Sequence, residues 1–416
     1  MEDEVEVHCD LQGECWRVGT LYRQPGRGRE TVAFQYHAAW LEHPARFSLE
    51  PALALGRGTF HPAPGADVFG SIGDSAPDTW GRRLLQRRER RLARDEGRAP
   101  RTLQEIDYLL GVTDIARMGA LRFKRPGDPD FQAPSIGGVP HLVQLGALMD
   151  SALRVDREDA ADDALDTILA PGSSLGGARP KASVRSAKGE LAIAKFPKDS
   201  DGYGQERWEH ITLALAATSG IRTPRHELLD VDGRAVLLSY RFDRDGARRI
   251  PFLSAMAMLQ ARDGERGSYP EIVDELGRHG ARARADAAEL FRRMVFNILV
   301  SNVDDHLRNH GFLWAGAAGW ILAPAYDLNP TPTDLKPRIL STNISLDEGT
   351  CSLPLALEQA ALFGLSSRDA RAIAAEVGRA VSGWRELAAT QGVSASELER
   401  MASAFEHEDL AAARAL

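Results

Sequence analysis

The sequence predicts an α+β protein with two lobes, and three observations support this fold class. Short runs of β-branched and aromatic residues separated by turns, which are typical of strands, gather before about residue 245. After about Phe252 the apolar residues mostly recur with the spacing of amphipathic helices. A length of 416 residues suits two to three domains or one large bilobal enzyme. We therefore expect strands in the earlier part of the chain and mostly helices after about Phe252.

The composition is that of a globular protein, and we expect it in a reducing cytoplasm. The hydrophobic and charged fractions, 43% and 26%, are ordinary values for globular domains. A net charge of −8 argues against a protein that binds nucleic acid through its overall charge. Cys9, Cys15 and Cys351 are too few and too scattered for a disulfide framework or a zinc ribbon. The acidic N-terminus lacks a signal-peptide pattern, and no apolar run is long enough to span a bilayer.

The first predicted domain covers residues 1–125. Strand patterns at 18–22 and 31–36 flank a Gly-rich turn, which is hairpin chemistry. From Pro77 the pattern becomes helical and leads into an arginine-dense stretch at 82–101, with nine arginines against three acids. That stretch is either a solvated helix face or a contact with an acidic partner or DNA phosphates. A further helix is expected at 103–110, opening at Thr102.

Residues 126–138, rich in Gly and Pro, are predicted to link the first domain to a second one at 139–245. The second domain opens with a helical segment, 140–169, whose acidic end is typical of a solvated face. The third predicted domain, 246–416, holds most of the helices. It closes with a helical tail that begins at Leu353.

A Gly/Ser-rich turn at 171–181 leads into two predicted strands, 182–184 and 191–197. Small residues between two strands let backbone N–H groups approach nucleotide phosphates, although this turn is not a Walker A sequence. A Gly-rich turn alone is usually only a turn. The pattern predicts that the second strand is buried and carries one lysine, whose burial without a partner would be costly. The candidates for nucleotide contacts here are Ser174, Gly176, Gly177, Lys181 and Lys195.

A helix predicted at 205–219 supplies a partner for the strand lysine. Glu206 and Glu209 lie near its start, and Gly220 marks its end. A strand lysine followed by a helix glutamate is the ion pair that positions the α- and β-phosphates in kinases. We therefore predict that Glu209 pairs with Lys195.

The apolar strand predicted at 236–244 runs into a polar turn, where a hinge between two lobes is expected. Tyr240 and Phe242 at this point are candidates to contact adenine. Core packing explains Phe242 equally well, so its role stays open.

The helix predicted at 286–299 delivers the chain to Asp304, and Asn309 follows five residues later. The same step separates the catalytic Asp from the metal-binding Asn in the protein-kinase catalytic loop. A predicted hairpin at 311–325 then carries Asp327. Asp304 would orient the proton of an acceptor hydroxyl, while Asn309 and Asp327 would hold Mg²⁺ against ATP phosphates. The alternative is a helix cap at Asp304 and a turn at Asn309.

Two neighbours of Asp304 leave alternatives open. Asp305 is a competing base, although the spacing favours Asp304. His306 either holds the loop or approaches the γ-phosphate of ATP. The order of Gly/Ser turn, strand lysine, helix glutamate, Asp-x₄-Asn and later Asp is the order that a phosphotransferase site needs, where catalysis is mostly positioning and charge stabilisation.

These segments resemble the HipA family of bacterial serine/threonine kinases, which serve as toxins of type II toxin–antitoxin modules. The resemblance covers nearly the whole chain and implies a bilobal, protein-kinase-like (HipA-like) fold. It also implies a β-rich N-terminal subdomain and an all-helical C-terminal lobe. It is carried by residues 19–22, 75–82, 174–181, 194–197, 241–244, 302–309 and Tyr326-Asp327.

The resemblance also implies roles for single residues. The family's catalytic Asp falls on Asp304, its metal ligands fall on Asn309 and Asp327, and its ATP lysine falls on Lys195. A serine of the Gly-rich loop is autophosphorylated in the family, which ejects the loop and inactivates the kinase. By position that serine is Ser174, with Ser173 as the adjacent alternative.

Partners and substrate follow from the same resemblance. It implies a non-specific serine/threonine protein kinase that acts on an aminoacyl-tRNA synthetase, glutamyl-tRNA synthetase in the best-known member. Phosphorylation of that enzyme stalls translation and gives growth arrest and drug tolerance (persistence). A HipB-like helix-turn-helix antitoxin is implied as partner, with operator DNA reached only through the antitoxin and no membrane involved.

The chain departs from the family pattern at two places, and two rival functions remain. Asp305 stands where a small residue is common, and Arg179-Pro180 stiffens the loop because proline fixes φ. Residues 304–309 also fit the D-x-H-x-x-N loop of phosphoinositide kinases, so a lipid or small-molecule kinase is the rival enzyme. A non-catalytic co-repressor of an antitoxin on operator DNA is the rival outside enzymes.

Overall fold

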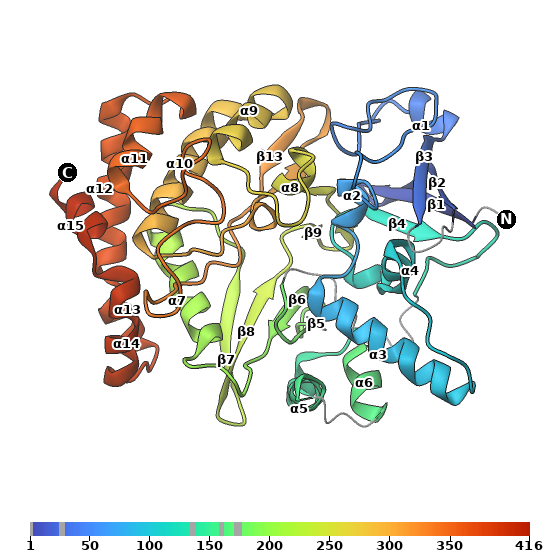
Figure 1. Cartoon of the computed structure of the whole chain (residues 1–416), viewed down its shortest axis with the longest axis horizontal. Coiled ribbons are helices and arrows are strands. Elements are labelled where there is room, and N and C mark those ends of the chain that lie inside the picture. Colours follow the sequence, from blue (N-terminus) through green and yellow to red (C-terminus); the bar gives the residue numbers. More distant parts are fainter. Residues whose placement is uncertain (1–2, 25–29, 134–138, 158–161, 170–176) are drawn as a thin grey trace. The chain divides into compact units, whose positions relative to one another are not determined.

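The computed structural model describes residues 3–24, 30–133, 139–157, 162–169 and 177–416 (Figure 1). The predicted turn at 25–28 and the loop residues Ser173, Ser174 and Gly176 lie outside the described residues. The chain divides into two compact units. Met1–Ser200 and Leu229–Leu253 form the first unit, and Asp201–Leu228 and Ser254–Leu416 form the second.

The first unit opens with an antiparallel sheet in the order β3-β2-β1-β4. Its strands are β1 (Asp3–Leu11), β2 (Glu14–Gln24), β3 (Thr31–Tyr36) and β4 (Leu121–Lys124). Val5, Val7 and Cys9 alternate as buried residues of β1, because successive side chains of a strand point to opposite faces. The predicted strands at 18–22 and 31–36 are confirmed as neighbours.

Short helices and one long helix complete this N-terminal part. They are α1 (Ala38–Glu42), α2 (Gly70–Gly73), α3 (Thr79–Asp95), α4 (Glu105–Gly111) and the 3₁₀ turn η1 (Asp114–Ala116). The helix expected to open at Thr102 begins at Glu105 instead. Gln104 is its N-cap and forms a capping box with Asp107, so the first orphan N–H groups are satisfied there.

A second sheet has the order β5-β6-β8-β7. Its strands are β5 (Lys181–Arg185), β6 (Leu191–Lys195), β8 (Arg234–Tyr240) and β7 (His226–Val231), which enters the first unit at Leu229. One face of this sheet packs with α5 (Leu145–Asp156), α6 (Asp162–Leu169) and the start of α3 in an apolar core. The members of that core include Trp80, Leu84, Met149, Ile168, Val184, Ala194, Phe196 and Leu238.

The single helical segment predicted at 140–169 is therefore two helices, preceded by the 3₁₀ turn η2 (Leu142–Gln144). The reason is visible in the sequence, because no large apolar residue stands between Val155 and Leu165 to continue the buried stripe. The unit ends with the short strands β9 (Arg244–Asp245) and β10 (Arg248–Arg249), and β11 (Phe252–Ser254) carries the chain into the second unit.

The second unit is built mostly from helices around α10 (Ala283–Leu299), eleven of whose residues are buried. Helix α7 (Gln205–Thr218), predicted within the domain 139–245, belongs to this unit. The other helices are α8 (Ala255–Met258), α9 (Tyr269–His279), α11 (Leu353–Glu358), α12 (Ser367–Ser382), α13 (Trp384–Thr390), α14 (Ala395–Phe405) and α15 (Glu408–Ala415), with the 3₁₀ turns η3 (Leu307–Asn309), η4 (Gly316–Ala318) and η5 (Gln359–Phe363).

The predicted hairpin is confirmed as β12 (Gly311–Trp314) paired with β13 (Trp320–Leu322). The expectation of an all-helical lobe is therefore wrong. Besides this hairpin, residues 323–352 form neither a helix nor a long strand. Their backbone groups instead bond to the loop around Asp304, as described below. In the part of the chain that the structure describes, no helix is long and apolar enough to cross a membrane. The predicted α+β fold class is confirmed.

Candidate active site

The loop that follows α10 brings Asp304 and Asn309 onto one compact turn. The His306 N–H donates to the Asp304 carbonyl at 2.9 Å, and the Asn309 N–H donates to the His306 carbonyl at 2.7 Å. The Asn309 side-chain amide closes the turn by donating Nδ2–H to the Asp304 carbonyl at 2.9 Å. Since its nitrogen holds the loop, the Oδ1 atom of Asn309 is the one suited to a cation. The five-residue spacing between Asp304 and Asn309 therefore corresponds to a closed turn in the structure.

Asp304 presents its carboxylate to solvent, with the side chain 59% exposed. Its oxygen Oδ1 lies 3.4 Å from the ammonium of Lys336, which is also exposed. Sequence reasoning did not find Lys336, which stands in the irregular segment 323–352. The exposed carboxylate is accessible to an acceptor hydroxyl, as a base requires.

Asp305 has the opposite environment, with 1% of its surface exposed. Oδ1 accepts the backbone N–H groups of Ser341 at 3.0 Å and Thr342 at 3.3 Å. Oδ2 accepts the Tyr269 hydroxyl at 2.7 Å and the amide Nδ2–H of Asn297 at 3.4 Å. Burial raises the pKa of Asp305 to about 7, against the lowering effect of these donors. With both oxygens engaged, Asp305 anchors the segment 323–352 to the loop and does not face an acceptor.

The corner that carries Asp327 is tied to the same loop. The Tyr326 hydroxyl donates to the carbonyl of Arg308, next to Asn309, at 2.7 Å. Asp327 adopts a left-handed backbone with φ of 58°, a conformation that non-glycine residues keep only where their surroundings impose it. Its Oδ1 accepts Nδ2–H of Asn329 at 3.1 Å. A carboxylate and an amide oxygen are hard donors of the kind that Mg²⁺ prefers, so the residue types fit the predicted ion.

His306 is the N-cap of the 3₁₀ turn η3, and its ring nitrogen Nδ1 is buried without a hydrogen-bond partner among the described residues. His310 is packed more deeply, with its ring edge-on to Tyr269 at 5.2 Å and Nε2 at 3.3 Å from the Asp305 carbonyl. Burial lowers the pKa of His310 to about 3, so this imidazole is neutral. His310 is thus a structural residue, while both roles predicted for His306 remain open.

In the first unit, Lys195 lies on the sheet face opposite the apolar core. The strand β6 alternates, with Ala194 and Phe196 buried and Lys195 half-buried. The expectation of a wholly buried strand is therefore wrong. Lys195 stands directly opposite Lys181 on β5 and Leu237 on β8, and residues paired in this way share a face. Lys181 and Lys195 therefore share one face of the sheet, and a contact of Lys195 with a nucleotide phosphate stays a prediction.

Lys181 forms a buried ion pair that the local sequence pattern does not predict. Its ammonium lies 2.7 Å from Oδ2 of Asp78 and 3.3 Å from the carbonyl of Gly177. Asp78 is also the N-cap of α3, where its Oδ1 accepts Gly81 N–H at 2.7 Å. The indole N–H of Trp80 donates to the Lys181 carbonyl at 3.2 Å. These contacts hold the end of the Gly/Ser-rich turn against the start of α3, and nucleotide contacts of Gly177 and Lys181 stay a prediction.

The two adenine candidates lie in different surroundings. Tyr240 stands opposite Ala192 and packs against the apolar core, on the face away from Lys195. We therefore leave Tyr240 out of the site proposed below. Phe242 is half-buried and its ring lies 6.2 Å from that of Phe252. The prediction for Phe242 stays untested.

The segment Arg241–Arg244, part of the family resemblance, is a structural clamp in the first unit. The carboxylate of Asp243 is fully buried and forms ion pairs with the guanidinium groups of Arg241 at 2.5 Å and Arg244 at 2.6 Å. It also accepts a hydrogen bond from the Gly119 N–H at 2.7 Å. Burial alone would raise the pKa of Asp243, but the two guanidinium groups lower it to about 2. Arg241 also donates to the Ala116 carbonyl at 2.8 Å. The clamp joins the end of β8 to the N-terminal subdomain.

Several arginines of the arginine-dense stretch form ion pairs and hydrogen bonds within the first unit. Arg82 forms a bidentate pair with Glu105, and Arg91 pairs with Asp166 on α6 at 2.6 Å. Arg87 donates to the Val155 carbonyl at the end of α5. Neither predicted interpretation, a solvated face or a phosphate contact, had anticipated this bracing of α3 against its neighbours. The exposed arginines of the helix are Arg88, Arg90 and Arg94.

Glu206 and Glu209 of α7 are both buried in the second unit, with 3% and 4% of their surfaces exposed. Lys195 belongs to the first unit and Glu209 to the second. The predicted ion pair between them therefore stays a prediction.

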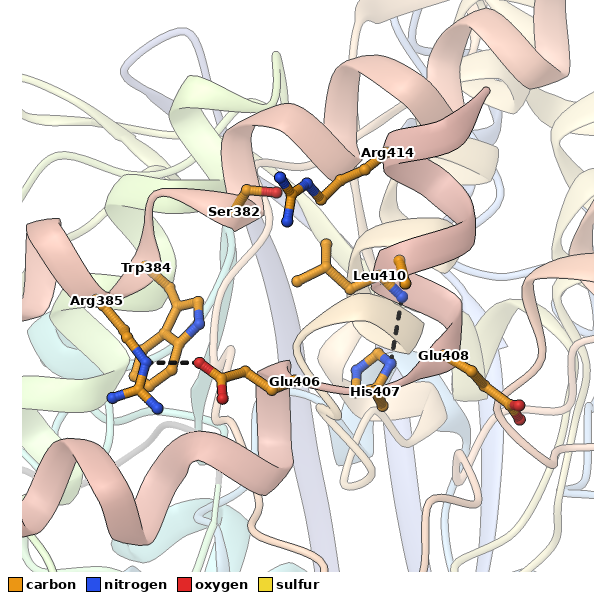
Figure 2. Close-up of a pocket in the computed structure, with 9 residues that line it drawn as sticks. Ser382, Trp384, Arg385, Glu406, His407, Glu408, Leu410 and Arg414 are labelled. Atoms are coloured by element: carbon orange, nitrogen blue, oxygen red, sulfur yellow. Dashed lines mark hydrogen bonds and ion pairs between the residues drawn. The ribbon is translucent and has the colours of Figure 1, made fainter.

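A cavity of about 440 Å³ lies among the C-terminal helices (Figure 2). Arg385 pairs with Glu406 beside it, and the His407 ring accepts the Leu410 N–H at 3.3 Å. His407 also approaches the Leu299 carbonyl, at the end of α10, through Nε2 at 3.2 Å. None of the predicted site residues lines this cavity, and we assign it no ligand.

Comparison with protein families identifies both halves of the chain. Residues 173–384 match the HipA-like C-terminal domain, and residues 11–110 match the HipA N-terminal domain. The chain belongs to the HipA family. The match includes both the Asp304 to Asn309 loop and the strand that carries Lys195.

Individual relatives agree with this assignment. The chain is 31% identical over 155 residues to "Putative kinase Y4dM" of Sinorhizobium fredii, covering 33% of this chain and 37% of that protein. It is 26% identical over 164 residues to a "Putative kinase" of Haemophilus influenzae, covering 35% and 48%. These alignments span less than half the length of either relative.

A solved structure shares the fold across the chain. HipA of Shewanella oneidensis MR-1, determined in a complex with HipB and its operator DNA, matches with a TM-score of 0.65. The match covers 99% of this chain and 96% of that one at 16% sequence identity. At this identity the likeness concerns the fold.

Proposed function

We propose that the chain is an ATP- and Mg²⁺-dependent serine/threonine protein kinase. The observation that carries the proposal is the turn that joins Asp304 to Asn309, with the Asp327 corner fastened to it through Tyr326. These are the three oxygen-bearing side chains that phosphoryl transfer requires, in the required order. Membership of the HipA family and the names of the relatives support the same activity.

The proposed reaction is an in-line transfer. The acceptor hydroxyl oxygen forms a bond to the γ-phosphorus, the bond from that phosphorus to the β–γ bridging oxygen breaks, and ADP leaves. Asp304 accepts the proton of the hydroxyl. Asn309 and Asp327 would hold Mg²⁺, whose charge offsets that of the phosphates. Lys195, oriented by Glu209, would neutralise the α- and β-phosphates.

We further propose that this kinase is the toxin of a type II toxin–antitoxin module. The fold shared with HipA of the Shewanella complex supports a HipB-like antitoxin as partner, with operator DNA reached through it. The family resemblance supports autophosphorylation at Ser174 and an aminoacyl-tRNA synthetase as target. Glutamyl-tRNA synthetase is the first candidate to test.

Incubation of the full chain with Mg²⁺ and ATP labelled in the γ-phosphate tests the activity. We expect label on Ser174, or on Ser173 beside it, and its loss in Asp304→Ala. Label that appears only on an added lipid or small molecule would favour the rival enzyme. Absence of both label and nucleotide binding would refute an enzymatic role and leave the co-repressor.

A further inference from the structure

One cation stands beside the proposed base. The Lys336 ammonium lies 3.4 Å from Oδ1 of Asp304, and its side chain is 57% exposed. Ion pairs between two exposed side chains add little to folding stability, because water screens them. The contact therefore does little for the fold, and a role toward a ligand of Asp304 is the alternative to consider.

The backbone that carries Lys336 is held at both ends, although the side chain is free to move in solvent. Before it, the Thr331 N–H donates to the Ser301 carbonyl at 3.1 Å. After it, Arg338 donates to the Ser301 hydroxyl at 3.0 Å and to the Ile298 carbonyl at 2.9 Å. Arg338 also pairs with buried Asp409 at 2.8 Å. This bracing fastens the segment to the start of the Asp304 loop.

Two prolines stiffen the same segment, since proline fixes φ. Pro337 follows Lys336 directly, and the Pro332 carbonyl accepts the N–H of Leu335 at 3.0 Å in a turn. The braced backbone therefore keeps the Lys336 ammonium within reach of the Asp304 carboxylate, which it contacts at 3.4 Å.

The choice of lysine is itself unusual in this chain. The sequence has 51 basic residues, and six of them are lysines. Lys336 is the one lysine within Asp201–Leu228 and Ser254–Leu416, the second unit. The buried ion pairs of that unit use arginine, whose planar fork suits fixed geometry, whereas lysine supplies a compact movable charge.

We propose that Lys336 is a further catalytic residue, whose ammonium contacts the phosphoryl group as it passes to the acceptor oxygen held by Asp304. This inference rests on the proposed kinase function and deepens it. Charge in the transition state is spread over the three equatorial oxygens of the transferred group. When the Lys336 ammonium moves from Asp304 to these oxygens, its attraction to them grows as their negative charge develops. An interaction that is stronger in the transition state than in the ground state accelerates the reaction.

Steady-state kinetics of transfer from MgATP give the first test. Lys336→Ala is expected to lower kcat by about 100-fold with little change in KM for ATP, since the contact forms in the transition state. Lys336→Arg should recover part of the loss because it restores the charge. Lys188→Ala removes an exposed lysine from the turn between β5 and β6 and is the matched control, with unchanged kcat. An unaltered kcat in Lys336→Ala would overturn the proposal.

Affinity labelling gives a second test that needs no turnover. An acyl phosphate of ATP carries a reactive carbonyl on its γ-phosphate, and attack by a lysine amine forms an amide and releases ATP. We expect acylation of Lys336 in the inactive Asp304→Asn variant, suppressed by excess MgATP, while acylation of Lys188 is insensitive to MgATP. Protected labelling of Lys195 without labelling of Lys336 would overturn the proposal while supporting nucleotide binding. Absence of protected labelling at both lysines would count against the proposed function itself.

Discussion

Replacing Asp305 by Asn is expected to remove a specific pH dependence of stability. Burial raises the pKa of this carboxyl from an ordinary value of 3.8 to about 7 in the folded protein. Between those two values the folded state keeps a proton that the unfolded state has released, so stability falls as pH rises. Below about pH 4 the contribution is fully present, and above about pH 7 it is lost.

The magnitude follows from the size of that window. One pKa unit corresponds to about 1.4 kcal/mol, so the fall between pH 5 and pH 8 is about 3 kcal/mol. Three buried ionisable groups near Asp305 have pKa values held outside this range. Burial lowers the pKa of His310 to about 3, raises that of Cys351 to about 12 and raises that of Tyr269 above its ordinary value.

Urea unfolding of the wild type and of Asp305→Asn at pH 5 and pH 8 measures the effect. The variant cannot ionise, so its stability relative to the wild type should rise by about 3 kcal/mol between the two pH values. Asp304→Asn removes the exposed neighbouring carboxyl and is the control, with a difference within about 0.5 kcal/mol at both pH values. A stability difference for Asp305→Asn that does not change with pH would refute the account of its burial.

Three further changes probe the rest of the molecule. Asp243→Ala leaves Arg241 and Arg244 buried without a counter-ion, and a fall of about 3–5 kcal/mol in the free energy of unfolding is expected; an unchanged urea midpoint would contradict the clamp. Asp327→Ala should abolish growth arrest on expression, and arrest that persists would refute its metal role. Tyr326→Phe loses one hydrogen bond worth about 1 kcal/mol, so the Mg²⁺ concentration for half-maximal rate should rise; an unchanged Mg²⁺ dependence would separate the corner from the metal.

Local patterns in the sequence predicted what depends on near neighbours. The hairpin at 18–36 follows from alternating side chains, and the turn between Asp304 and Asn309 follows from a fixed spacing of five residues. Local alternation did not predict the orientation of side chains on strand β6. Apolar residues occupy both of its faces, so the period of two is hidden and Lys195 could not be placed on the face away from the apolar core.

Contacts between distant residues could not be predicted, because nothing local requires them. Asp305 meets Ser341 and Thr342 across 36 and 37 residues, and Lys336 reaches Asp304 across 32. Lys181 pairs with Asp78 across 103 residues. The sequence could suggest that Asp305 needed an explanation, but only the packed segment 323–352 supplies one. That segment has no periodicity to recognise.

The proposed function depends most directly on Asp304 as the base of a phosphoryl transfer for which Asp327 holds the metal. Nucleotide affinity and a single turnover with MgATP, measured on the same samples, separate these roles. We expect Asp304→Asn to bind MgATP like the wild type yet transfer the phosphoryl group at least about 100-fold more slowly, whereas Asp327→Asn loses the Mg²⁺-dependent part of binding. Transfer at the wild-type rate by Asp304→Asn would contradict the claim.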